Sequence, residues 1–377
     1  AVFALSLIVL CGPLAAQEGA EAVEARLEAA PPQAAGAASI TFTLTNRGDR
    51  PVSVLKWHTP LEGIRNDIFR ILHEGERVPY VGPMVKRGQP TAEDFVTLAP
   101  GETVSAVVDL GAVYAFPEPG RYEVRYDPDL QGVSRPDVRL AAGPIVLAAE
   151  IRSEDSEVIE LREVPKPQVP EVSAPTVAAP EPGFINCSDG QKNTVRQALA
   201  DAEKGAQIAL ENLQKNACSG NDTYKTWFGA CDSTRYQTVT NKVSAIKSTL
   251  NTKTMTFNCA PPSNCDGTIA YVYKYSPYTI YLCGAYWNLG DKGYDTKAGT
   301  IVHEVSHFAV VADTSDYAYG TSACKTLAQN DPNKAIANAD SYEYFGETLA
   351  GGLEHVTALI VILAAIAAER LLRRRSA

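Results

Sequence analysis

The run TIVHEVSHFAVV, from Thr300 to Val311, has the apolar spacing of a helix and carries His303, Glu304 and His307. On a helix, residues four apart lie one turn apart on the same face, so both imidazoles can reach one metal ion. Glu304 falls beside that ion, where its carboxylate can take a proton from a water molecule. The run therefore predicts a helix with a metal site, against the plainer interpretation that the histidines are only solvated.

Length and composition indicate a globular protein of two domains. The chain has 377 residues, of which 45% are hydrophobic and 21% are charged. Its formal net charge is -10, and the part between the two ends has no long basic stretch. Nucleic acid is therefore not expected as a partner.

Both ends of the chain have the composition of addressing segments. Residues 1–16 hold an apolar run followed by small residues, which is typical of a signal peptide and predicts secretion. Residues 351–377 form an apolar stretch that ends in the cluster Arg373 to Arg375, as in a membrane or sorting tail. Secretion with possible tethering through this tail is the expected localisation.

Between these ends the composition changes twice. Residues 17–38 are rich in Ala and Glu and are predicted to be a flexible lead-in. Residues 39–150 show short alternating strands separated by turns, which favours a β-sandwich of immunoglobulin-like kind. Residues 151–183 are predicted to be a linker because prolines crowd its second half. Residues 184–350 make up the second domain, with helices expected over 193–213, 236–252 and 322–329, a hairpin over 269–282, and a partly helical stretch over 333–345.

Beyond the leader, all the cysteines lie in this second domain. In an exported chain they are expected to form disulfides, with six able to pair and one left over. Their scatter, without Cys-x-x-Cys spacing, argues against a cysteine zinc site. They are Cys187, Cys218, Cys231, Cys259, Cys265, Cys283 and Cys324.

A hydrolytic zinc site needs a third protein ligand besides the two imidazoles. No further histidine follows in the soluble part, which leaves two aspartates. Asp313 has the spacing of a metzincin ligand, although Val310 stands where that class needs Gly. Asp316 lies nine residues after His307, in TSDYAYG. Both aspartates remain candidates on spacing alone.

From about Cys187 to Phe345 the chain resembles the aspzincins, the deuterolysin family of zinc endopeptidases, and among them the peptidyl-Lys metalloendopeptidase branch. The likeness rests on the His-Glu-x-x-His motif with the following Asp and Tyr-Gly, and on TWFG (226–229), YLCGAYW (281–287) and NAD (338–340). It implies an α+β fold with a zincin-like, mostly helical catalytic domain. It also implies one zinc ion per chain, with Asp316 as third ligand, Glu304 as general base and Tyr319 as oxyanion donor.

The same resemblance implies how the cysteines pair and what the enzyme cuts. It implies disulfides Cys187–Cys259 and Cys265–Cys283; Cys218 and Cys231 are then expected to close their own loop, and Cys324 is left over. Asp340 and Glu343 match the acidic pair that this branch places in the pocket for a substrate lysine. Cleavage on the amino side of lysine is therefore predicted. The plainer interpretation of this acidic pair is a solvated helix face.

Together these inferences describe a secreted, zymogen-like zinc endopeptidase that acts on lysine-containing proteins or peptides. The first domain resembles the propeptide region of bacterial aspzincins, so it is expected to cover the cleft as an internal inhibitor. Two alternatives stay open. One is a metzincin-like protease that uses Asp313, and the other is a non-catalytic surface binding protein on a zincin scaffold.

Overall fold

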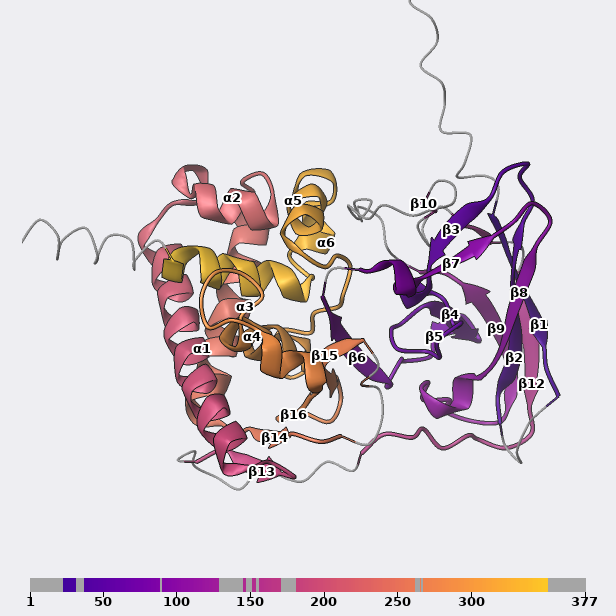
Figure 1. The fold of residues 1–377 in the computed structure, drawn as a ribbon, viewed down its shortest axis with the longest axis horizontal. Coiled ribbons are helices and arrows are strands. Elements are labelled where there is room, and N and C mark those ends of the chain that lie inside the picture. The colour runs from indigo at the N-terminus through magenta and orange to yellow at the C-terminus, as the bar shows by residue number, and fades with distance from the viewer. Residues whose placement is uncertain are drawn as a thin grey trace, which may run out of the picture.

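The computed structural model describes residues 23–31, 37–88, 90–128, 145–146, 151–153, 156–170, 181–261, 265 and 267–351 (Figure 1). The predicted signal peptide and, apart from Gly351, the predicted C-terminal tail lie outside these residues. Among the described residues, no helix combines the length and the apolar character needed to cross a membrane.

The first part of the chain is built of β-sheets. One sheet has the order β11-β1-β2-β8, with β1 (Val23–Ala29), β2 (Ser39–Asn46), β8 (Thr103–Asp109) and β11 (Arg152–Ser153). A second has the order β10-β3-β7, with β3 (Val52–Leu55), β7 (Phe95–Leu98) and β10 (Ile145–Val146). A third has the order β12-β9-β4-β5, with β4 (Phe69–His73), β5 (Glu76–Arg77), β9 (Gly120–Tyr126) and β12 (Glu157–Leu161).

Two predicted boundaries differ from this arrangement. Strand β1 lies inside the stretch expected to be a flexible lead-in, and it pairs with β2 along its whole length. Its residues Val23, Ala25 and Leu27 alternate inward, a pattern hidden by the Ala- and Glu-rich composition. Strands β11 and β12 lie inside the predicted linker; β12 pairs with β9 and buries Ile159 and Leu161.

The second part consists mainly of helices. They are α1 (Asp189–Lys215), α2 (Asp222–Phe228), α3 (Ser233–Thr252), α4 (Lys297–His307), α5 (Thr321–Asn330), α6 (Pro332–Ala335) and an unlabelled helix over residues 339–351. Helix α1 begins four residues before the predicted start because Ser188 and Gln191 form a capping box. Short 3-10 helices are η2 (Lys56–His58), η3 (Ala92–Asp94) and η4 (Leu110–Ala112) in the first part, and η6 (Cys218–Gly220) and η7 (Gly284–Asn288) in the second.

Helix α4 carries the metal-site motif but is shorter than the sequence suggests. The apolar spacing predicts a helix up to Val311, whereas α4 ends at His307 and Phe308 leaves the helical conformation with a ψ of 125°. The amide of Ala309 then bonds to the carbonyl of Lys274, which lies outside the helix. The chain turns away after His307, so the apolar residues beyond it belong to a loop.

A five-stranded sheet joins the two parts of the molecule. Its order is β13-β14-β16-β15-β6, with β13 (Gly183–Ile185), β14 (Thr256–Asn258), β15 (Thr268–Tyr273) and β16 (Thr279–Leu282) from the second part. The edge strand β6 (Pro83–Arg87) comes from the first part and pairs antiparallel with β15. In Figure 1 the indigo β6 lies beside the orange β15, between the strand-rich and helical parts. Buried apolar residues of both parts form one continuous core.

Three disulfides brace the second part. They join Cys187 to Cys259, Cys218 to Cys231 and Cys265 to Cys283. These are the pairings that the sequence analysis expects. Cys324 is buried and free.

Candidate metal centre

Helix α4 and the loop after it build the candidate metal centre. The side chain of Thr296 caps α4 by accepting a hydrogen bond from the amide of Gly299. His303 and His307 then face the same way, and both are fully buried. The loop reverses at Asp313, whose φ is 50°, and the amide of Thr314 bonds back to the carbonyl of Ser306. This reversal carries the chain toward Asp316.

Three potential ligand groups converge. The Nε2 atoms of His303 and His307 lie 3.1 Å apart. The Asp316 carboxylate lies 3.3 Å from Nε2 of His303 and 3.4 Å from Nε2 of His307. Each Nδ1 atom has another partner: Asp340 for His303 at 2.7 Å, and the Thr314 carbonyl for His307 at 3.2 Å. An imidazole that donates through Nδ1 leaves Nε2 free for a metal ion.

The Asp316 carboxylate fits a bound cation. The residue is 2% exposed, and neither of its side-chain oxygens accepts a hydrogen bond within the described residues. A buried carboxylate in that state is costly unless an ion or an ordered water satisfies it. Asp313, the competing aspartate, lies elsewhere: its side chain is 61% exposed and pairs with Lys274 at 2.8 Å.

Glu304 lies on the same helix and has the environment of a proton acceptor. It is fully buried, and within the described part of the chain its two oxygens have no hydrogen-bond partner. Burial raises the pKa of Glu304 to about 8. A carboxylate with a pKa near neutrality can take a proton from water and return it to a leaving group.

The hydroxyl of Tyr319 contacts strand β6, which belongs to the first part of the chain. This hydroxyl donates a hydrogen bond to the Val85 carbonyl at 2.7 Å. The Tyr319 ring packs edge-on against Trp57 and is stacked with His58, both in η2. Burial raises the pKa of Tyr319 well above its ordinary value, so the group stays a neutral donor.

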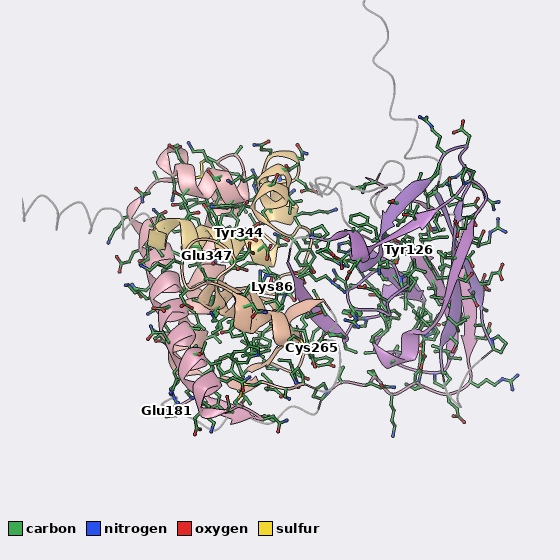
Figure 2. The ribbon with its side chains drawn as sticks, viewed as in Figure 1. Lys86, Tyr126, Glu181, Cys265, Tyr344 and Glu347 are labelled. Atoms are coloured by element: carbon green, nitrogen blue, oxygen red, sulfur yellow. A yellow bond between two sulfur atoms is a disulfide. The ribbon has the colours of Figure 1, made fainter. Side chains whose placement is uncertain are left out.

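Next to Val85, the side chain of Lys86 enters an acidic pocket in the helical part (Figure 2). Its Nζ lies 2.6 Å from Glu343 and 3.0 Å from Asp340, and 3.9 Å from Asp295. The Lys86, Asp340 and Glu343 side chains are all 0% exposed. Burial opposes the charge on Lys86, but Asp340 and Glu343 hold its pKa well above the ordinary value.

A further acid, Glu347, lies near Glu343. Glu347 accepts hydrogen bonds from the amide and hydroxyl of Thr296, at 2.9 and 2.8 Å, so it braces the start of α4. Burial, followed by the charge of Glu343, raises the pKa of Glu347 to about 9. Burial opposes the ionised form of Asp340, yet the charge of Lys86 lowers the pKa of that carboxyl to about 2.

The structure thus leaves Asp313 outside the site and adds residues from the first part. The predicted residues that it brings together are His303, Glu304, His307, Asp316, Tyr319, Asp340 and Glu343. The sequence analysis did not identify Val85, Lys86 or His58 as part of this site. One sequence offers no signal for them, because they meet Tyr319 and Glu343 only through the packing of two distant parts. Asp295, with its positive φ of 55°, was also missed, although Asp at a turn before a helix cap is a visible signal.

Comparison of the chain with known proteins identifies its family. Residues 213–347 match the aspzincin family profile, described as lysine-specific metallo-endopeptidase. An extracellular protease of Aeromonas hydrophila is 33% identical over 82% of this chain and 87% of its own length. A peptidyl-Lys metalloendopeptidase of Grifola frondosa is 32% identical with the same two coverages.

The chain belongs to the aspzincin family. As an aspzincin it is a zinc metalloendopeptidase, so zinc is its cofactor and proteins or peptides are its substrates. A solved zinc peptidase from Grifola frondosa is 40% identical, covers 43% of this chain and 96% of its own length, and has a TM-score of 0.40.

Proposed function

We propose that His303, His307 and Asp316 hold the zinc ion of this aspzincin. The convergence of their ligand atoms and the unsatisfied buried carboxylate of Asp316 support this assignment. When bound, zinc acts as a Lewis acid and lowers the pKa of a coordinated water. Glu304 takes a proton from the attacking water and passes it to the leaving nitrogen, and the Tyr319 hydroxyl stabilises the oxyanion.

A Glu304→Gln variant tests the role of the base. The amide keeps the size of the side chain but cannot accept the proton, so zinc should stay bound while peptide hydrolysis falls by at least about 100-fold. Zinc content and hydrolysis of a reporter peptide are measured on the same sample. Hydrolysis at a near-native rate would remove Glu304 from this role.

We further infer that the enzyme cuts on the amino side of lysine. The observation that carries this proposal is the pocket of Asp340 and Glu343, which encloses the ammonium group of Lys86 without exposure to solvent. Two buried carboxylates favour a cation and reject an acidic side chain, since unpaired charge in such a pocket is costly.

Lysine specificity is tested by digesting an unfolded protein and sequencing the new N-termini. We expect lysine at nearly all of them. Glu343→Gln should weaken the preference for lysine, whereas Asp201→Asn, at a surface position of α1, should not change it. New N-termini without a preference for lysine would contradict the proposal.

We also propose that the chain is secreted. The extracellular relative supports secretion.

We propose in addition that the boundary between the two domains lies within the proline-rich stretch. The first domain is then an immunoglobulin-like domain that blocks the cleft of the second. The strand β6 supports the block, because it lies along β15 and fills the acidic pocket. Cutting the chain within residues 171–180 and separating the two parts should raise specific activity. Equal activity before and after separation would rule out the inhibitory role.

A further inference from the structure

Strand β6 belongs to the first part of the chain, but it lies against the second part as a bound peptide would. An extended peptide that adds a strand to a sheet edge gains backbone hydrogen bonds, while its side chains enter pockets. In this structure Val85 is paired with Tyr271 and Lys86 with Ala270, antiparallel to β15. Val85 is 1% exposed and Lys86 is not exposed at all. The first part therefore presents β6 to the site in the form of a substrate.

The two sides of one peptide bond are held by two different parts of the site. On one side, the Val85 carbonyl accepts the hydrogen bond of Tyr319 at 2.7 Å. On the other, the Lys86 ammonium lies between Asp340 and Glu343. A protease that cuts before lysine needs its oxyanion donor and its lysine pocket in this order along the substrate. The Val85–Lys86 bond thus has the register of a bond to be cut.

The rest of the site is assembled while β6 is in place. The imidazole nitrogens of His303 and His307 and the Asp316 carboxylate converge within 3.4 Å of one another. The two oxygens of Glu304 are buried and have no hydrogen-bond partner among the described residues, so β6 does not occupy them. Nothing in this arrangement requires β6 to leave before the reaction.

We propose that the zinc-loaded chain hydrolyses its own Val85–Lys86 bond. This inference rests on the proposed function. One water molecule is consumed: its oxygen bonds to the Val85 carbonyl carbon, and the bond from that carbon to the Lys86 nitrogen breaks. Glu304 carries a proton from the water to that nitrogen. Val85 ends as a carboxylate and Lys86 as a new N-terminal amine.

The cut does not by itself release β6. On one side of the bond, the Tyr80 hydroxyl donates to the Pro83 carbonyl at 2.8 Å. On the other, Arg87 forms an ion pair with Glu62 and lies 5.0 Å from the centre of the Trp57 ring. Both new ends stay attached to the folded first part, so the cut chain remains compact.

The first test measures how β6 is bound before any zinc is added. Metal-free full-length protein is treated briefly with an acetylating reagent, and each lysine is quantified by mass spectrometry. Lys86 should react at least about 100-fold more slowly than the exposed Lys166, because its ammonium is buried and paired. Equal reaction of the two lysines would show that β6 does not occupy the pocket and would overturn the inference.

The second test adds Zn²⁺ to the same protein and follows new N-termini with time. A fragment that begins at Lys86 should appear with first-order kinetics that do not change on tenfold dilution. Lys86→Ala should slow this cut by about 100-fold or more, because the acidic pocket is left without its cation. Lys56→Ala, a lysine change elsewhere in the first part, should leave it unchanged, and Glu304→Gln should abolish it.

A lysine-containing reporter peptide in the same reaction separates the possible failures. Hydrolysis of the peptide with an intact Val85–Lys86 bond, or with cutting only at Lys166, would overturn the inference and leave the proposed function standing. Absence of both cuts in the zinc-loaded chain would overturn the inference, because the uncut β6 then blocks the site. The proposed function would fail as well only if the chain also left the peptide intact after cutting within residues 171–180 and separation of the two parts.

Discussion

His303 uses its two ring nitrogens for different tasks. Its Nε2 atom faces His307 and Asp316, and its Nδ1 atom lies 2.7 Å from Asp340. The same Asp340 oxygen also accepts a hydrogen bond from the Lys86 ammonium at 3.0 Å. One carboxylate therefore orients a proposed metal ligand and belongs to the proposed lysine pocket. The second member of the pocket, Glu343, has its shorter contact with Lys86, at 2.6 Å.

Because Asp340 contacts both His303 and Lys86 whereas Glu343 has its shorter contact with Lys86, substitutions of the two acids should have different effects. Asp340→Asn should weaken zinc binding by about 10- to 100-fold, because partners of ligating histidines contribute that much to metal affinity. It should also weaken the preference for lysine. Glu343→Gln should weaken the lysine preference with a much smaller effect on zinc. Competition with a chelator gives the zinc affinity, and equal affinities in the two variants would contradict the assignment.

At the scale of elements, the sequence predicted some segments well because their signals are local. The hairpin expected over residues 269–282 is the antiparallel pair β15 and β16, and the motif helix was recognised from the spacing of His303 and His307. Strand β6 was missed because all five of its residues are buried. A strand buried on both faces does not alternate, and its sequence PMVKR includes two charged residues that are normally exposed.

The packing of α4 against the helix over residues 339–351 depends on Gly299. A Cβ atom at this position would overlap Glu347 and lie 2.8 Å from Oε1 of Glu343. Gly299→Ala should therefore lower the free energy of unfolding by about 1–3 kcal/mol, the usual range for overpacking. Gly190→Ala, in the first turn of α1, is the matched control because a Cβ there meets nothing within 4 Å. Thermal unfolding of both variants checks this, and equal melting temperatures would contradict it.

At the scale of the whole molecule, the central contacts join residues far apart in the sequence. Lys86 and Glu343 are 257 positions apart, and Tyr319 and Val85 are 234 apart. Spacing within one sequence carries no information on such pairs. The sequence therefore offered candidate metal ligands on and just after one helix, but gave no sign of strand β6. The expected covering role of the first part came from a family resemblance and named no residue.

His58 makes the stability of the folded chain sensitive to acid. Burial, followed by the charge of Arg87, lowers the pKa of His58 from 6.5 to about 3, although Asp316 acts in the opposite direction. Between these values the unfolded chain binds a proton that the folded chain does not. Stability is therefore lost as the pH falls below about 6.5, by up to about 1.4 kcal/mol per pH unit.

Unfolding of the metal-free chain in denaturant measures this effect. The pH is varied from about 4.5 to about 7.5, which spans the ordinary titration range of histidine. His58→Gln should make the free energy of unfolding less dependent on pH. His73→Gln is the matched control: hydrogen bonds to the Arg121 carbonyl and to Glu118 raise the pKa of His73, so its loss should not reduce the acid sensitivity. An unchanged pH dependence in His58→Gln would contradict the proposed role.

The position of the zinc ion tests the central claim most directly. The measurement is a crystal structure of the zinc-loaded Glu304→Gln chain, with the metal located by its anomalous scattering. We expect one ion bound by Nε2 of His303, Nε2 of His307 and the Asp316 carboxylate, with Lys86 still between Asp340 and Glu343. An ion held instead by His303, Asp340 and Glu343, the other group of potential ligands among the described residues, would contradict the account.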